Sequence, residues 1–298
     1  MSGATSTWGQ TWRGIVDLTR YREYLIFVIV TTLIGAQVSG VPLDWRLLLV
    51  LIANWLAVGF GFMINDIEDA ADDALNPEKI NRNPVSAGRL DRRMAYAASF
   101  AVAILAAVTF YFLGTIPFLL GLATLVFGLL YSSRRVRLKS IPFVDLVVHA
   151  LGLAGFQLLC AYFTFAPVGS RQWIAPFVFV MSLSMYGELF NEVRDLEGDL
   201  KAGVTHTAAV LGWRSTHVLM YALLAVAGLS FVYTIVTGLV PWWVVVVLFV
   251  LAAFIMARPI LKMRRGSAVD LVGPLHVPAQ IVGALTMIVW VAVGYFLQ

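Results

Sequence analysis

Long stretches without a charged residue dominate this chain and restrict what it can fold into. A helix needs about 20 apolar residues to cross a bilayer. Two of the stretches are too long for one helix and are divided by turns with Gly and Pro, at residues 114–117 and 237–241. The charge-free stretches run over 25–43, 47–65, 94–133, 146–170, 172–187, 215–257 and 271–298. They predict an all-α integral membrane protein with nine transmembrane helices in one bundle.

The distribution of basic residues supports this count and predicts the orientation. With the N-terminus in the cytoplasm, 19 of the 21 Lys and Arg residues fall on the inner side, and only Arg46 and Arg171 fall outside. Cytoplasmic loops of membrane proteins carry such an excess of basic residues. The net charge of +4 is therefore explained by membrane topology, and we expect no nucleic-acid partner. We predict a multi-pass protein of the cytoplasmic membrane, with its N-terminus cytoplasmic and its C-terminus outside.

The first 21 residues differ from the rest because they are polar and carry two tryptophans. Trp8 and Trp12 are typical of segments that lie at the level of lipid headgroups. No charged region leads into a short apolar core here, so we predict no cleaved signal peptide. We expect residues 1–21 to form an interfacial segment of a single domain that covers residues 1–298.

Acidic residues gather at two places in the chain. Twelve of the 17 Asp and Glu residues lie within 66–93 and 188–214, at the inner ends of the second and sixth predicted helices. Residues 65–73 align without a gap onto residues 191–199, and both share the pattern Asn, acid, aliphatic, any residue, Asp, three residues, Asp. Four predicted helices separate the copies, so both copies end on the same side of the membrane. We interpret the match as an internal repeat of parallel type.

The spacing of these acids predicts a metal site. In each copy three acids step by three and four residues, which places them on one face of a helix. Like charges at this spacing repel, and the repulsion grows where water is scarce. Mg²⁺ takes one or two carboxylates and completes its shell with water and phosphate oxygens, so the two trios predict a diphosphate bridged by metal. Solvated helix ends are the alternative, and the repeated spacing argues against it. The trios are Asp66, Asp69 and Asp73, and Glu192, Asp195 and Asp199.

Three further ionisable residues lie in or beside predicted spans. Asp145 and His149 are four residues apart at the inner end of the fifth predicted helix, and Glu188 precedes Glu192 by one turn. Ionisable residues inside spans are candidates for functional sites by default. A hydrogen-bonded structural pair explains Asp145 and His149 equally well, and Glu188 is a candidate for shaping the acceptor side.

These motifs resemble those of the UbiA superfamily of intramembrane prenyltransferases. The first family motif, N-D-x-x-D-x-x-x-D, matches residues 65–73 in full, and the second, D-x-x-D-x-x-x-D, matches residues 192–199 with Glu192 in place of the first Asp. Pro84 and Gly88 after the first motif also match, as does the Tyr131-Ser132 pair at the end of the fourth predicted helix. The resemblance covers essentially the whole chain and agrees with the predicted number of helices.

The chain also departs from the family pattern in its loops. Many members have Arg directly before the proline of the first-motif loop, whereas here Asn83 intervenes and Arg82 stands one place earlier. The usual Arg-Pro at the start of the first helix is replaced by Arg20, Tyr21 and Arg22. These departures leave the acidic motifs untouched but weaken assignment to a well-studied subfamily.

The resemblance implies an enzyme that transfers a prenyl chain from a polyprenyl diphosphate to a lipophilic acceptor and releases pyrophosphate. It implies Mg²⁺ as the cofactor, with two ions, and an active site that opens toward the cytoplasmic side. The implied metal ligands are Asp66, Asp69, Asp73, Glu192, Asp195 and Asp199. The implied catalytic residues are Asp66, Asp69, Asp73, Asp195, Asp199 and Tyr131. The implied diphosphate-binding residues are Asn65, Lys79, Arg82, Arg134, Arg137, Lys139 and Asn191.

The acceptor is less well defined than the transfer reaction. The commoner family members favour an aromatic quinone precursor, and a carotenoid, a tetrapyrrole or a glycerol-phosphate lipid is an alternative. An ion-coupled transporter or divalent-cation channel is a function of a different class, but transporter sites usually lie near the membrane midplane, and these acids lie at one end. The expected partners are the polyprenyl diphosphate, the acceptor and membrane lipid, and no obligate protein partner is evident.

Overall fold

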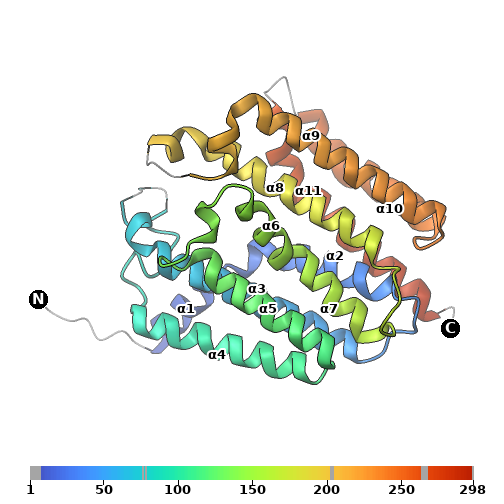
Figure 1. Cartoon of the computed structure of the whole chain (residues 1–298), viewed down its shortest axis with the longest axis horizontal. Helices are drawn as coiled ribbons and strands as arrows, with labels where there is room; N and C mark the ends of the chain where they lie inside the picture. Colours follow the sequence, from blue (N-terminus) through green and yellow to red (C-terminus); the bar gives the residue numbers. More distant parts are fainter. Residues whose placement is uncertain (1–7, 76, 78, 202–204, 263–267, 297–298) are drawn as a thin grey trace, which may run out of the picture.

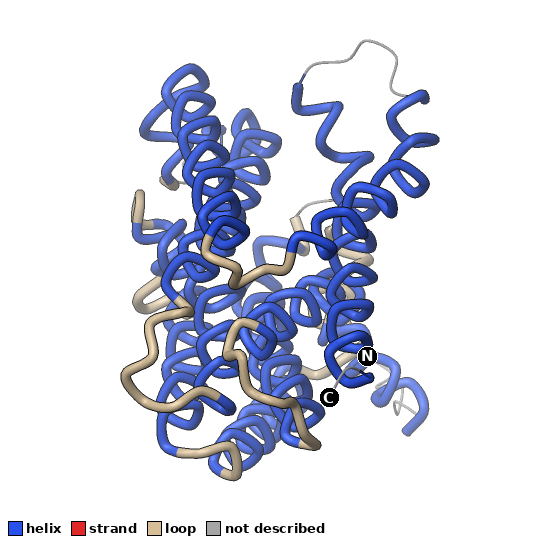
Figure 2. Tube along the Cα trace, turned by 90° about the vertical axis from the view of Figure 1, so that its right-hand side faces the viewer, coloured by secondary structure: helices blue, strands red, loops and turns tan. Residues whose placement is uncertain are grey.

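The computed structural model describes residues 8–75, 77, 79–201, 205–262 and 268–296. Within these ranges the chain is helical and contains no β-strand (Figure 1, Figure 2). The first half contains α1 (Trp8–Thr19), α2 (Tyr21–Gln37), α3 (Arg46–Asp73), α4 (Arg92–Tyr111), α5 (Thr115–Ser132) and the short 3-10 helix η1 (Leu138–Ser140). The second half contains α6 (Val144–Ala150), the π-helical turn η2 (Leu151–Gly155), α7 (Phe156–Phe165), α8 (Ile174–Lys201), α9 (Thr207–Val236), α10 (Trp242–Lys262) and α11 (Ala268–Phe296).

Eight helical segments of the described chain are long and apolar enough to cross a membrane, by length and composition. They confirm an all-helical, multi-pass architecture. The division predicted at residues 114–117 falls where α5 begins after α4, and the one predicted at residues 237–241 falls between α9 and α10. The predicted count of nine differs at α2, which corresponds to the first predicted span but has only 17 residues. The ninth span and the orientation of the termini stay predictions.

The span predicted over residues 146–170 is interrupted by the turn η2. A π-helical turn breaks the regular backbone hydrogen bonding, and a freed backbone group inside a membrane needs another partner. Asn54 of α3 supplies one, because its Nδ2 donates to the Gln157 carbonyl oxygen at 3.0 Å. Thr31 of α2 donates to Gln157 Oε1 at 2.8 Å, so α2, α3 and α7 are joined by a buried polar network.

Small residues allow the helices of the first half to pack closely. A Cβ atom at Gly35 of α2 would overlap the carbonyl group of Leu158 in α7, and one at Gly128 of α5 would lie 3.2 Å from Gly61 Cα in α3. Lipid tails are as apolar as the helices, so close van der Waals contact between helices replaces the hydrophobic effect as a stabilising term.

The two acidic motifs occupy the C-terminal ends of α3 and α8. α3 packs against α4 and α5, and α8 packs against α9. In Figure 1, α9 and α10 lie along the upper edge and α4 along the lower edge, with α3 and α8 between them. The motif helices therefore belong to different packed groups, and the space between those groups is the place to look for a site.

Candidate active site

One cavity of about 1430 Å³ is lined by both motif helices. Its wall includes Asn65 of α3 together with Asn191 and Asp195 of α8. Most of the remaining wall is apolar and extends to Val38 and Trp290, near the far ends of α2 and α11. Six basic side chains line the cavity: Arg20, Arg22, Lys79, Arg82, Lys139 and Arg194.

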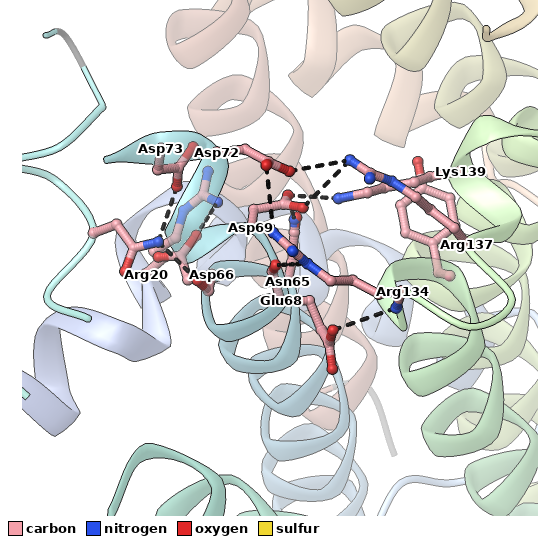
Figure 3. A network of polar contacts seen from close by, with 12 residues as sticks. Arg20, Asn65, Asp66, Glu68, Asp69, Asp72, Asp73, Arg134, Arg137 and Lys139 are labelled. Carbon is pink, nitrogen blue, oxygen red and sulfur yellow. Dashed lines mark hydrogen bonds and ion pairs between the residues drawn. The ribbon is translucent and has the colours of Figure 1, made fainter. Parts of the chain in front are cut away.

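Asp66 is 1% exposed and lies beside Arg20, as Figure 3 shows, and beside Arg82. Its Oδ1 accepts a hydrogen bond from Arg20 Nη1 at 3.1 Å and lies 3.7 Å from Arg82 Nη2. Its Oδ2 is buried and has no hydrogen-bond partner among the described residues. Burial by itself would lower the pKa of Arg20, but its hydrogen bond to Glu23 and the charge of Asp66 raise that pKa, so the guanidinium stays protonated.

Asp69 lies one turn earlier than Asp73 and contacts a different set of donors. Its Oδ2 accepts from Lys139 Nζ at 2.5 Å and from Asn65 Nδ2 at 3.1 Å. Its Oδ1 lies 3.9 Å from Arg137 Nη2. Figure 3 shows Lys139 and Arg137 reaching toward this carboxylate from the segment after α5.

The first trio is neutralised by basic side chains, which its local sequence does not predict. No Lys or Arg stands one turn away from these acids on α3, so the local sequence offers them no partner of opposite charge. Arg20 and Lys139 are 46 and 70 residues away from the acids that they contact. Helical spacing reveals only neighbours on the same helix, so pairs formed between distant segments are invisible to it.

Asn83 joins the motif helix to the loop that follows it. It is fully buried, and its Nδ2 donates to the Asp66 carbonyl oxygen at 2.7 Å and to Asp73 Oδ2 at 2.9 Å. Its Oδ1 accepts from Val85 N at 3.0 Å. Asn83 is one of the departures from the family pattern, and the structure explains it as the residue that fixes Asp73 against the loop.

Replacing Asn83 by Ala is expected to lower the free energy of unfolding by about 1–3 kcal/mol, because buried hydrogen-bonding groups lose their partner. The measurement is the Tm of the purified protein in detergent. Asn81→Ala is the matched control, since Asn81 lies in the same loop with an exposed side chain. Equal Tm values for the two variants would contradict the role given to Asn83.

Arg134 and Arg137 bind the outer side of α3 and do not line the cavity. Arg134 Nε donates to the Glu68 carbonyl oxygen at 2.9 Å, and Arg134 Nη2 lies 3.3 Å from Asp72 Oδ1. Arg137 Nη2 lies 3.5 Å from Asp72 Oδ2. These contacts hold the segment after α5 against α3. The other predicted diphosphate-binding residues line the cavity: Asn65, Lys79, Arg82, Lys139 and Asn191.

The second motif has different surroundings despite its matching sequence. Glu192 is buried, accepts from Ala208 N at 2.8 Å and lies 3.2 Å from His206 Nδ1, so it caps the start of α9. Asp195 is exposed, lines the cavity and contacts Arg194, whose Nε lies 3.0 Å from its Oδ1. Asp199, the third member, lies outside the residues whose side chains the structure describes.

Tyr131 is held by an acid from another helix. Its hydroxyl donates to Glu188 Oε1 at 2.7 Å, and Glu188 Oε2 lies 3.4 Å from His149 Nδ1. His149 therefore pairs with Glu188. Asp145 accepts from Thr207 N at 2.7 Å and from Thr207 Oγ1 at 2.6 Å, which links α6 to the start of α9.

The sequence-based site residues did not include three arginines of the cavity wall, namely Arg20, Arg22 and Arg194. The first two stand where the family usually has Arg-Pro, so a signal for them was present in the departure from the pattern. Arg194 follows directly from its place between Glu192 and Asp195 in the second motif. Basic residues are common in loops and at helix ends of membrane proteins. The sequence alone therefore does not distinguish these three arginines from basic residues that do not line the cavity.

The donor set fits a divalent metal ion that also binds phosphate. A buried carboxylate oxygen without a partner, Asp66 Oδ2, is a ligand suited to a hard cation. In the described chain no group of three His, Cys, Asp or Glu side chains is arranged to hold a metal by itself. Mg²⁺ is usually bound by one or two carboxylates plus water and substrate phosphates, so a full protein cage is not required.

Comparisons with known proteins identify the family of this chain. The digeranylgeranylglyceryl phosphate synthase of Sulfolobus acidocaldarius is 30% identical over 221 residues, which are 69% of this chain and 75% of that protein. The lycopene elongase/hydratase of Haloarcula japonica is 30% identical over 53% of this chain and 52% of its own length. A UbiA homologue from Archaeoglobus fulgidus, solved with GPP and Mg²⁺, has the same fold, with a TM-score of 0.70 and 20% identity over 95% of this chain and 99% of that one. The sequence model of the UbiA prenyltransferase family matches residues 25–271, and the chain therefore belongs to this family of membrane prenyltransferases.

Proposed function

We propose that this prenyltransferase moves a polyprenyl chain from its diphosphate to the free hydroxyl group of a glycerol-phosphate lipid, with Mg²⁺ as cofactor. The observation that supports this best is that one cavity has basic and acidic side chains at one end and an apolar wall beyond them. A polyprenyl diphosphate has the same division into a charged head and an apolar tail. Membership of the prenyltransferase family leaves no support for a transporter or channel.

Lys79, Arg82 and Lys139 are the proposed diphosphate-binding residues, because all three line the cavity. Charge-assisted hydrogen bonds from such groups are shorter and stronger than neutral ones. Negative charge grows on the diphosphate as the bond to the allylic carbon breaks. Fixed cations stabilise that charge most when the surroundings contain little water.

Mg²⁺ is proposed as the cofactor because the Archaeoglobus fulgidus homologue was solved with GPP and Mg²⁺, and because the donor set described above fits such an ion. Asp66, Asp69 and Asp195 are the proposed ligands, and Asp73 and Asp199 complete the proposed acidic set. The ion would neutralise part of the charge on the departing diphosphate. Two ions are proposed because two motifs contribute acids. The cap that Glu192 makes on α9 argues for a supporting role instead of the metal contact first expected of it.

The apolar wall is proposed to hold the prenyl tail and to keep water away from the reacting carbon. Side chains such as Phe27, Phe127 and Leu183 line it, and a long prenyl tail can lie against them. Water would capture the electron-poor allylic carbon as an alcohol, so a dry wall protects the reacting group. Tyr131 is proposed to lie beside that carbon, since it lines the cavity near both motifs.

The acceptor proposed here differs from the aromatic quinone precursor favoured by the sequence. The comparisons give the quinone precursor no support, and several relatives are digeranylgeranylglyceryl phosphate synthases. Six basic side chains in the cavity wall also provide positive charge for a diphosphate and for a second phosphate group. Arg20 and Arg22 are the proposed contacts for that second phosphate, because they approach from a different segment than Lys139.

The test is a product assay with purified protein, Mg²⁺ and geranylgeranyl diphosphate. We expect an ether product with geranylgeranylglyceryl phosphate, detected by mass spectrometry together with released pyrophosphate. Hydroxybenzoate and lycopene serve as competing acceptors in parallel reactions. Product from lycopene alone would contradict the proposed acceptor and favour the activity named for the Haloarcula japonica relative.

The motif end of the cavity is proposed to face the cytoplasm. The loop after the first motif carries Lys79 and Arg82, the segment after α5 carries Lys139, and cytoplasmic loops are the basic ones in membrane proteins. The test is labelling of single cysteines introduced at exposed loop positions in intact cells. Labelling by a membrane-impermeant reagent at residue 81 would contradict this orientation.

A further inference from the structure

Three polar side chains from three helices meet in the cavity wall. Glu188 of α8 accepts the hydrogen bond of Tyr131 from α5 at 2.7 Å, and its other oxygen lies 3.4 Å from His149 Nδ1 of α6. All three line the cavity. The diphosphate-binding role proposed above uses none of the three, so this cluster has no assigned task apart from the place of Tyr131 beside the reacting carbon.

Two buried hydroxyl groups beside this cluster point to a polar ligand. Ser132 follows Tyr131, and Ser184 lies one turn before Glu188 on α8. Both side chains are at least nine-tenths buried and line the cavity, and the Oγ of each has no hydrogen-bond partner in the described chain. Buried polar atoms are paired in nearly all proteins, so unpaired hydroxyls on a cavity wall indicate where a ligand supplies the partner.

Polar and charged groups from several helices surround the Glu188 carboxylate. The Tyr131 hydroxyl donates to its Oε1 at 2.7 Å. Arg194, two turns along the same helix, interacts with it electrostatically. Asp145 and Glu192 are the other acids that face Tyr131, and His149 is the titratable group on α6 that faces Glu188.

We propose that Glu188 is the base that takes the proton from the attacking hydroxyl group of the acceptor, with Tyr131 and His149 as its positioning residues. This inference rests on the proposed function, in which the acceptor attacks through a hydroxyl. The acceptor oxygen forms a bond to the first carbon of the prenyl chain, and the bond from that carbon to the diphosphate breaks. The diphosphate leaves with the electron pair of that bond, and the hydroxyl proton moves to Glu188, which returns it to water after the products leave.

Different side chains carry out diphosphate binding and proton transfer in this arrangement. The acids of the first motif contact Arg82 and Lys139, two of the proposed diphosphate-binding residues, and are thereby committed to the diphosphate end. Glu188 lacks such a direct ion pair with Lys or Arg among the described residues, so its carboxylate is available for proton transfer. A base within reach of the attacking hydroxyl accelerates such reactions by about 10²–10⁴-fold.

The decisive variant is Glu188→Gln, which keeps the size of the side chain and an oxygen for Tyr131 but cannot take a proton. We expect kcat for ether formation to fall by about 100-fold. Glu188→Asp should recover part of the loss. Glu197→Gln is the matched control, since Glu197 lies on the same helix with an exposed side chain and does not line the cavity.

Two further measurements separate catalysis from a structural role. In the wild-type protein kcat/KM should rise with pH as the base ionises, and Glu188→Gln should lose that rise. The increase in Tm caused by Mg²⁺ with a non-hydrolysable prenyl thiodiphosphate should be the same in Glu188→Gln and wild type. Binding of the donor is thus expected to survive while transfer fails.

The outcomes distinguish this inference from the proposed function. Wild-type protein that forms no ether from geranylgeranylglyceryl phosphate contradicts the proposed function. An active wild type beside a Glu188→Gln variant within about threefold of it, with the same pH profile, contradicts the role of Glu188 alone. Loss of the thiodiphosphate-induced Tm increase in Glu188→Gln also overturns it, because that result would place Glu188 in donor binding.

Discussion

Asp69→Asn is expected to lower kcat/KM for prenyl transfer by roughly 10³-fold, a loss like that seen when a preorganised electrostatic group is removed. Asp69 contacts Lys139 and Asn65, which both line the cavity, so its charge lies at the diphosphate end. The amide keeps the shape of the side chain but is a poor ligand for a hard cation. The measurement is initial rate of pyrophosphate release at saturating Mg²⁺.

Asp72→Asn is the matched control for this substitution. Asp72 lies on the same helix, is 55% exposed and pairs with Arg134 and Arg137 outside the cavity. Loss of a pair as exposed as this costs about 0–1 kcal/mol, so both stability and turnover should stay near the wild-type values. Equal rates for the two variants, whether both high or both low, would contradict the specific role of Asp69.

Removal of Mg²⁺ with EDTA is expected to abolish turnover, and added Mg²⁺ should restore it. Each motif offers the ion too few ligands without phosphate oxygens, so metal and diphosphate should bind cooperatively. Linkage requires that each tightens the binding of the other by the same factor. The measurement is Tm with Mg²⁺ alone and with Mg²⁺ plus a prenyl thiodiphosphate, since ligands that bind only the folded state raise Tm. We expect a small increase in the first case and a larger one in the second.

Variants of the two motifs test whether they act on one ligand. Asp69→Asn and Asp195→Asn should each remove the additional Tm increase, and the double variant should lose little more. Independent, additive losses would mean that α3 and α8 carry two separate sites, although both line one cavity. Asp199 is included in the proposed acidic set because its position matches the sequence motif.

The sequence predicted those features that depend on neighbouring residues or on contact with lipid, namely the membrane spans and the turns between them. Gly114 and Pro241 mark helix ends because turns of Gly and Pro punctuate helices, and both predicted divisions are confirmed. The first span ends earlier than predicted, at Gln37, where Val38 closes the helix and Gly40 adopts a φ of +67°. An absence of charge indicates what tolerates lipid, but it does not locate the residue at which a helix stops.

The residues that contact the motif acids could not be predicted from the sequence. Asp66 binds Arg20, Asp73 binds Asn83, and Glu192 caps α9, none of which follows from spacing along one helix. The two motifs match in sequence, yet one trio is paired with cations from three segments and the other motif contributes a cap. Equal spacing places the acidic side chains of both motifs on one face of their helix. The residues that these side chains contact depend on which helices pack beside that face.

The sequence by itself determined a helical membrane protein, the two acidic motifs and the family's transfer chemistry. Lipid excludes charge over whole spans, and helical periodicity brings residues three and four apart to one face, so both signals are contained in short windows. Only the tertiary structure decided which acids are buried, which cations neutralise them and that Glu188 meets Tyr131 and His149. Those contacts join segments up to 70 residues apart, and they form only when helix packing brings the segments together.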